Sequence, residues 1–233
     1  MPGNDRTWRQ LTVWLHVVTS LGWMALALTL LALLALSVSD PAHAASATAM
    51  AHFLDTVLLA PLANASASTG LVLSLGTAWG LIHQRWVLTK FALTLGQLYA
   101  GIFLLSDALG ETAATVHAEP ALVAGTAAMA GALGFQAWLS VTKPWPRTRW
   151  ARHRDTGRPV RLPTAPAALF AAAVLAPLVD IAVGTVVGFP TPVLSLLSVV
   201  AAAVVRRRAL RAPRAAGRMQ YGDTAAAIGE TRP

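Results

Sequence analysis

The sequence predicts an all-α protein, a bundle of six membrane-spanning helices with both termini in the cytoplasm. Its 233 residues are 55% hydrophobic and only 12% charged, whereas a soluble domain carries about 25% charged residues. Long apolar runs recur along the chain, and a helix needs about 20 such residues to cross the hydrocarbon core of a bilayer. Because the runs are rich in leucine and alanine and do not alternate with polar residues, they favour helices over a β-barrel.

Six apolar segments are the expected spans. They cover Leu11–Val38, Ala51–Trp79, Trp86–Leu105, Ala121–Val141, Ala165–Val187 and Pro192–Val205. Between the last two, Gly188 to Pro192 holds two prolines and a glycine, which favour a tight reversal over a continuous helix. The sixth segment is short, so we expect Arg206 to extend from its end to the membrane interface.

The positive charges support this count independently. With six spans and a cytoplasmic N-terminus, all 18 Lys and Arg residues fall on one side, and the loops 39–50, 106–120 and 188–192 contain none. This distribution obeys the positive-inside rule. The resulting parts are a cytoplasmic N-terminus (1–10), a four-span bundle (11–142), an Arg-rich cytoplasmic loop (143–164), a two-span hairpin (165–210) and a disordered cytoplasmic tail (211–233).

The charged segments allow two other interpretations, a secretory signal and nucleic-acid binding. Arg6, Arg9 and the sequence Ala42-His43-Ala44 imitate a secretory signal, but the 28-residue apolar run between them is longer than a signal core of about 7–15 residues, which favours a retained span. The net charge of +8 is expected to set topology and to contact anionic lipid headgroups of the plasma membrane. Nucleic-acid binding is not expected, because no basic stripe is interleaved with aromatic residues.

The sequence contains no recognisable catalytic or phosphate-binding motif. The absence of cysteine excludes disulfides, thiol catalysis and cysteine-ligated metals. The candidate functional residues are therefore the polar side chains of the spans, which are costly in a membrane.

His16, in the first span, is the first candidate for a cofactor site. Ser20 and Trp23 follow at i+4 and i+7, so the three residues share one helix face. One hypothesis makes His16 a ligand of haem b or a metal, although no second histidine lies at the same depth. The alternative is a neutral imidazole hydrogen-bonded to a polar group on the second, third or fourth span, with Trp23 buried beside it.

A second candidate lies at the opposite side of the membrane. His52 and Asp55 are spaced i, i+3 and point the same way; with His117 they are candidates to bind a divalent metal such as Cu(II) or Zn(II). The alternative is a solvated acidic rim, because the spacing matches no known metal signature.

Asp180 is the most costly ionisable residue of the predicted spans. We expect it to face the bundle, either protonated or with a partner. Asn64, Gln97, Tyr99 or His52 could reach it if their helices are neighbours. Two roles stay open: a proton or cation pathway, and an interhelical hydrogen bond.

The segments Leu15 to Trp23 and Ser74 to Leu81, the latter continuing through Trp86 to Lys90, together resemble an uncharacterised family of bacterial integral membrane proteins. That family is loosely similar to the copper resistance D membrane proteins, which share a His…Trp first span. The resemblance covers about residues 10–140. It implies a membrane protein with His16 as first cofactor candidate but no particular reaction.

Two functional classes follow from the sequence. The first is a non-enzymatic membrane protein that binds a haem or metal, or passes a small cation. The second is a structural subunit of a homo- or hetero-oligomeric membrane complex, whose polar residues serve only helix packing. A membrane enzyme ranks below both.

Overall fold

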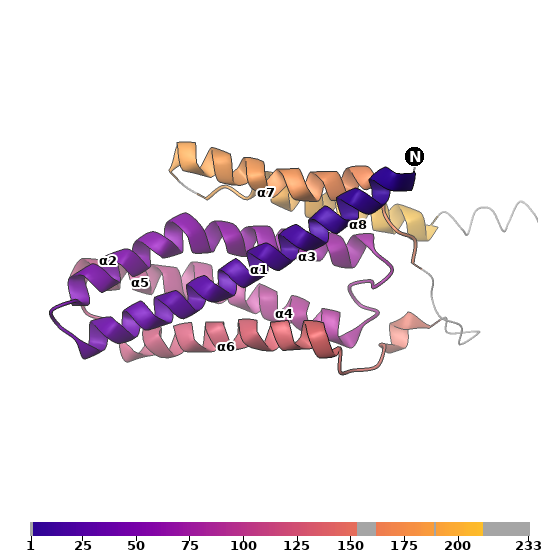
Figure 1. The fold of residues 1–233 in the computed structure, drawn as a ribbon. Coiled ribbons are helices and arrows are strands. Elements are labelled where there is room, and N and C mark those ends of the chain that lie inside the picture. The colour runs from indigo at the N-terminus through magenta and orange to yellow at the C-terminus, as the bar shows by residue number, and fades with distance from the viewer. Residues whose placement is uncertain (1, 153–161, 189, 212–233) are drawn as a thin grey trace, which may run out of the picture.

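The computed structural model describes residues 2–152, 162–188 and 190–211, in which long helices dominate (Figure 1). Two π-helical turns, η1 (Asp55–Leu59) and η2 (Gly101–Leu105), join α2 to α3 and α4 to α5, so that each pair forms one continuous rod. A short 3-10 turn, η3 (Arg149–Ala151), lies in the loop after α6. The helices are α1 (Pro2–Ser39), α2 (Ala44–Leu54), α3 (Ala60–Gly76), α4 (Arg85–Ala100), α5 (Ser106–Thr115), α6 (Pro120–Thr142), α7 (Ala167–Val187) and α8 (Val193–Arg211).

The all-α fold class is confirmed in the described part of the chain. Five helical segments there are long and apolar enough to cross a membrane: Asp5–Ser39, Ala44–Gly76, Arg85–Thr115, Pro120–Thr142 and Ala167–Val187. The remaining long helix, α8, has 19 residues, and four arginines occupy its last six positions. It runs beside α7 as the return arm of a hairpin (Figure 1).

Several helices are longer than the apolar runs that predicted them. The loops expected at 39–50 and 106–120 are largely helical, because α2 begins at Ala44 and α5 continues to Thr115. The two extensions pack against each other, and Leu109 and Thr112 of α5 are buried there. Hydropathy alone locates the part of a helix inside the hydrocarbon, whereas packing decides where the helix ends. The predicted disordered tail lies, from residue 212 onward, outside the described residues.

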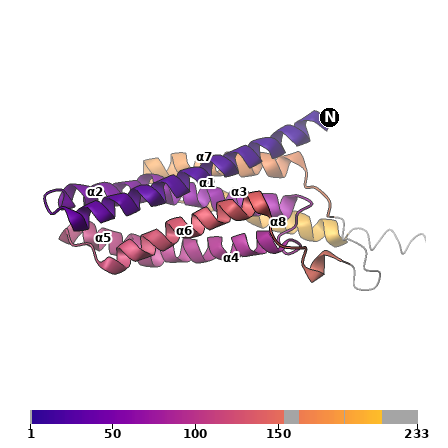
Figure 2. The same cartoon turned by 60° about the horizontal axis from the view of Figure 1, so that its bottom comes forward.

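The fold has two parts that share α1 and α3. In the first part, α1, the α2–α3 rod, the α4–α5 rod and α6 form a four-rod bundle (Figure 2). In the second, the α7–α8 hairpin covers the far side of α1 and α3. One buried cluster, around Trp23, Ala27, Ala130 and Leu133, joins α1 to α6. Another, around Phe170, joins the hairpin to α3 and α1.

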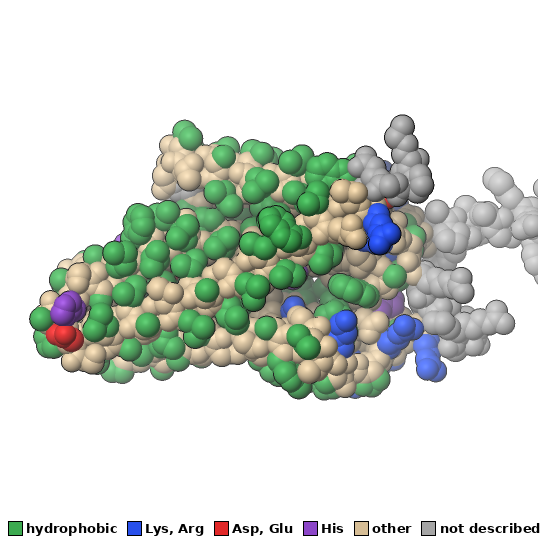
Figure 3. Space-filling view, in the orientation of Figure 1, with side chains coloured by type: hydrophobic (Ala, Val, Ile, Leu, Met, Phe, Trp, Pro, Cys, Tyr) green, Lys and Arg blue, Asp and Glu red, His purple; other side chains and the backbone are tan. Residues whose placement is uncertain are grey.

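The two ends of the molecule differ in charge. In the view of Figure 3, Lys and Arg side chains gather at one end and a carboxylate and a histidine lie at the other. We call the first the basic end; it carries Arg6, Lys143 and Arg206 together with the connections between α3 and α4 and between α6 and α7. Arg206 of α8 links both connections, because its guanidinium donates to the main-chain oxygen of Thr77, after α3, and to that of Pro163, before α7.

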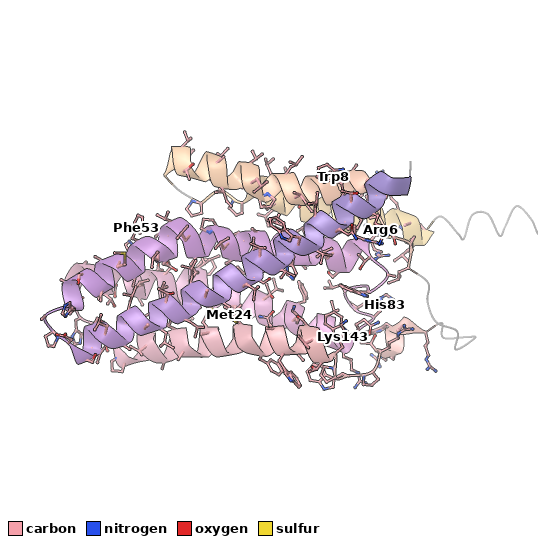
Figure 4. All side chains as sticks on the ribbon, viewed as in Figure 1. Arg6, Trp8, Met24, Phe53, His83 and Lys143 are labelled. Atoms are coloured by element: carbon pink, nitrogen blue, oxygen red, sulfur yellow. The ribbon has the colours of Figure 1, made fainter. Side chains whose placement is uncertain are left out.

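The start of the loop after α6 is fixed to the turn before α4. Thr148 donates its main-chain N–H to the His83 oxygen at 3.1 Å and its hydroxyl to the Ile82 oxygen at 2.6 Å. Gly80 makes the turn possible: its φ of +67° is in the left-handed region, and a Cβ there would clash with Leu162 and His83. This part of the Arg-rich loop therefore lies across the basic end of the bundle (Figure 4).

Candidate functional site: a cavity inside the four-rod bundle

A cavity of about 430 Å³ lies within the half of the four-rod bundle nearest the basic end. Such a volume is within the range of small-molecule sites, about 300–1,000 Å³. Figure 3 shows a hollow in this face between α1 and α6, with Lys or Arg atoms inside it and at its edge. Most of the lining is apolar. The polar side chains that line it are His16, Ser20, Ser66, Ser74, Lys90, Thr94, Gln136, Ser140 and Lys143, and the indoles of Trp23, Trp79 and Trp86 line it too.

His16 is fixed on one wall of the cavity by α3. Its Nδ1 lies 3.0 Å from the main-chain oxygen of Ser66 and 3.3 Å from Oγ1 of Thr69. A carbonyl oxygen can only accept, so Nδ1 carries the hydrogen. In the neutral imidazole, Nε2 is then the nitrogen with a free lone pair. It can accept a hydrogen bond or ligate a metal, and metal-bound histidines commonly donate their other N–H in this way.

Ser20 and Trp23 occupy the same face of α1. The hydroxyls of Ser20 and Ser66 are 2.7 Å apart, which places a second α1–α3 hydrogen bond one turn beyond His16. Trp23 is 3% exposed, and its buried indole Nε1 has no hydrogen-bond partner. The expected contact of His16 with the second span is thus confirmed, as is the burial of Trp23.

Lys90 supplies a positive charge from the opposite wall. This residue of α4 donates from Nζ to Oγ of Ser140 on α6 at 2.7 Å. Within the described residues, no carboxylate forms an ion pair with Lys90 and no Asp or Glu lines the cavity. An ammonium without a counterion in an apolar setting attracts an anion.

A chain of amides and hydroxyls continues from Ser140 toward the middle of the bundle. Ser140 donates to the Gln136 main-chain oxygen, and the Gln136 side chain accepts from Thr94 at 3.1 Å. Gln136 also donates to Gln97, which donates in turn to the Met129 main-chain oxygen. In these bonds polar groups of α4 are paired with polar groups of α6, and the bonds therefore join the two helices.

Three side chains that contact one another line the cavity at the basic end. Trp79 and Trp86 make an edge-to-face pair with centroids 5.8 Å apart. Nζ of Lys143 lies 6.0 Å from the Trp79 centroid and 5.9 Å from the Trp86 centroid, within the range of a cation–π contact. Lys143 ends α6 in a left-handed conformation with φ of 45°, which turns the chain toward the two indoles.

The structure does not bring the predicted outer metal ligands together. Asp55 is buried and accepts a 2.6 Å hydrogen bond from Ser106, which joins η1 to the start of α5. His52 lies near Gly110, whereas His117 is exposed and lies 3.7 Å from Glu119. In the described ranges there is no group of three His, Asp or Glu side chains that could hold a metal ion.

Asp180 is buried, as expected, but it is partnered by main-chain groups and not by any of the four side chains considered. Its two carboxylate oxygens accept the main-chain N–H groups of Leu194 and Ser195, at 3.0 Å and 2.8 Å. These amides belong to the first turn of α8, where N–H groups lack partners within the helix. Asp180 therefore caps α8 from the neighbouring helix, and the negative charge is stabilised by the helix dipole.

Sequence reasoning missed Lys90 and Gln136 as parts of the site. In the sequence Lys90 stands out only as the end of the segment that carries the family resemblance, and Gln136 does not stand out at all. A signal was present, since Lys90, Thr94 and Gln97 follow at helical spacing on one face of α4. Their meaning depends on which helix faces them, and hydropathy does not show that.

No protein-family model, curated protein or solved structure matches this chain.

Proposed function

We propose that the bundle cavity binds a small amphipathic molecule, one with an apolar body and an anionic head such as a carboxylate. The observation that carries the proposal is Lys90, whose ammonium lies in a mostly apolar cavity lined by no carboxylate of the described residues. His16 on the facing wall offers Nε2 as an acceptor, and the Trp23 indole offers an N–H donor. A few convergent polar groups in an apolar pocket are typical of ligand sites.

The same arrangement argues against passage of a cation. Lys90 and Lys143 are both positive and both line the cavity, and like charges repel an entering cation. Asp180, the other candidate for a cation pathway, has both oxygens engaged by the α8 amides. These interhelical hydrogen bonds explain why a carboxylate is present in α7 without a role in transport.

We further propose that the protein crosses the plasma membrane six times, with both termini in the cytoplasm. The support is the gathering of Lys and Arg side chains at the basic end (Figure 3), together with the positive-inside rule. In this orientation the cavity lies in the cytoplasmic half of the membrane, and the arginines of α8 lie among anionic headgroups.

Binding of radiolabelled decanoate to the detergent-purified protein tests the ligand proposal. Unlabelled decanoate should displace the label, whereas uncharged decanol should compete at least about tenfold less well, since a hydrogen bond to a charged group is worth about 1.5–3 kcal/mol. Lys90→Gln should remove this preference. The control Arg149→Gln, which changes a cation outside the cavity, should keep it.

Equal competition by decanoate and decanol, or an unchanged preference in Lys90→Gln, would contradict the proposal. Absence of any binding would favour a packing role for these residues in a membrane complex.

Haem b is a second candidate because it belongs to the same chemical class, an apolar ring with carboxylates. The observation that favours it is the Nδ1 hydrogen bond of His16 to Ser66, which would leave Nε2 free to ligate a haem iron. The absorbance spectrum of the purified protein tests this candidate. A Soret band that is lost in His16→Ala and retained in the control His43→Ala would support it, and a colourless protein would exclude it.

A further inference from the structure

We infer that the ligand enters the cavity sideways from the bilayer, and that it is a single-chain lipid anion of the fatty-acid type. The entrance lies between the halves of α1 and α6 nearest the basic end. We call it the side entrance and define it by Val13, Val17, Leu21, Ala137 and Val141, which all line the cavity. The inference rests on the proposed function, because Lys90 is the group that would hold the anionic head.

The entrance exists because α1 is bound to different partners along its length. Near Trp23 and Ala27 the helix packs against α6. Closer to the basic end α1 packs against α7 instead. There Thr12 donates to the Phe170 main-chain oxygen at 3.2 Å, and Asp5 accepts from the Ala167 N–H at 3.2 Å. The two helices therefore diverge, as Figure 1 shows, and residues of both helices line the cavity, which forms a wedge between them.

The wedge opens on the side of the bundle. Figure 3 views the long helices from the side, and the hollow is visible between α1 and α6 in that view. Its edges are exposed apolar side chains, with Val17 47% and Val141 82% exposed. In a membrane these side chains face acyl chains, so an acyl chain can extend from the cavity into the hydrocarbon without exposing apolar surface to water.

At the basic end the cavity is bordered by bulky and charged side chains. Lys143, Trp79 and Trp86 line it there and contact one another. Beyond them, Thr148 fastens the loop after α6 to Ile82 and His83, and Figure 4 shows Lys143 and His83 together at that end. A ligand dissolved in the bilayer therefore has the more direct path.

The dimensions and charges favour one chain with a compact head. A volume of about 430 Å³ is near the lower end of the range for small-ligand pockets, about 300–1,000 Å³. It accommodates a carboxylate at Lys90 and the first part of one acyl chain more readily than a glycerophosphate headgroup with two chains. The five residues that define the side entrance are all apolar, which suits an acyl chain.

Photo-crosslinking in phospholipid vesicles tests the entrance. The probe is a long-chain fatty acid with a diazirine near its carboxylate, and unlabelled palmitate serves as competitor. We expect palmitate-sensitive labelling on residues that line the cavity. Val17→Phe and Val141→Phe, which narrow opposite edges of the entrance, should each reduce it by about fivefold or more through steric overpacking. The control is Val18→Phe, since Val18 is 44% exposed on the same helix but does not line the cavity.

Two outcomes would overturn the inference. One is palmitate-sensitive labelling that is unchanged in both entrance variants or falls equally in Val18→Phe. The other is labelling confined to residues outside the cavity. If decanoate binding in detergent still depends on Lys90 in either case, the proposed function stands and only the bilayer route fails. If the preference for decanoate is unchanged in Lys90→Gln, the proposed function fails and the inference fails with it.

Discussion

The imidazole of His16 occupies the space beside Gly70. A Cβ on Gly70 would lie 2.8 Å from Cε1 and 3.3 Å from Nδ1 of His16, closer than packed atoms allow. The glycine therefore permits α1 and α3 to approach until the imidazole reaches the Ser66 carbonyl. A small residue on one helix thus determines the position of a functional side chain on another.

Gly70→Ala should destabilise the protein by about 1–3 kcal/mol, because the added methyl must displace a ring held by hydrogen bonds. Thermal unfolding in detergent measures the loss. The matched control is Gly96→Ala on α4, where a Cβ meets nothing within 4 Å; it should be neutral or stabilising by up to about 1 kcal/mol. Equal stability of the two variants would contradict the tight contact between His16 and Gly70.

Asp180→Asn should weaken the α7–α8 hairpin. The carboxylate accepts two main-chain N–H groups, whereas an asparagine amide has one acceptor oxygen and would direct its own donor at the other amide. The expected loss is about 1–2 kcal/mol, as for the loss of a helix cap. Faster hydrogen exchange at Leu194 and Ser195 should accompany it.

Asp107→Asn is the control for this experiment, because Asp107 is exposed and its substitution should leave both stability and exchange unchanged. An Asp180→Asn protein as stable as this control would show that the cap contributes little.

Reporter fusions test the proposed topology. A reporter placed after Arg211 should give a cytoplasmic signal, and one inserted near Glu111 should give an external signal, because the positive-inside rule retains the basic end in the cytoplasm. An external signal at Arg211 would remove α8 as the sixth span.

The contacts of the turn before α4 should weaken in mild acid. Burial and the neighbouring positive charge of Arg206 lower the pKa of His83 below its ordinary value of 6.5. The folded state therefore binds this proton less tightly than the unfolded state, so the stability that neutral His83 contributes is present above about pH 6.5 and is lost as the pH falls. Limited proteolysis of the loop after α6 should accelerate between pH 7 and pH 5.

His83→Gln provides the comparison for this pH dependence. It should remove most of the acceleration, because a glutamine side chain does not titrate in this range. An identical pH profile in His83→Gln would exclude His83 as the responsible group.

Much of the fold is predictable from the sequence because hydrocarbon imposes a strong local rule. Every main-chain polar group must be satisfied within the segment, so a long apolar run has to be a helix. The ends of the helices were less predictable: Ala44 to Met50 and Ser106 to Thr115 are helical although hydropathy assigned them to loops. They are stabilised by packing between α2 and α5, which are distant in sequence.

The contacts of the candidate residues were likewise only partly predictable from the sequence. His16 was expected to contact a neighbouring span because an unsatisfied imidazole is costly in hydrocarbon, and its contact with α3 follows that reasoning. The partners of Asp180 could not be predicted in this way. The sequence offers many polar side chains, but it gives no sign that a main-chain N–H of α8 lies 3.0 Å from the Asp180 carboxylate.

The sequence by itself determined that long apolar helices form, which residues lie on one helix face, and that the positive charges gather at one end. These properties depend on local periodicity and on the cost of placing polar groups in lipid, both of which can be read along a single helix. Only the tertiary structure decided that His16 and Lys90 line the same cavity and that α1 leaves α6 to join α7. Those relationships depend on how side chains from separate helices fit together, and in a chain rich in alanine and leucine many pairings have similar hydropathy.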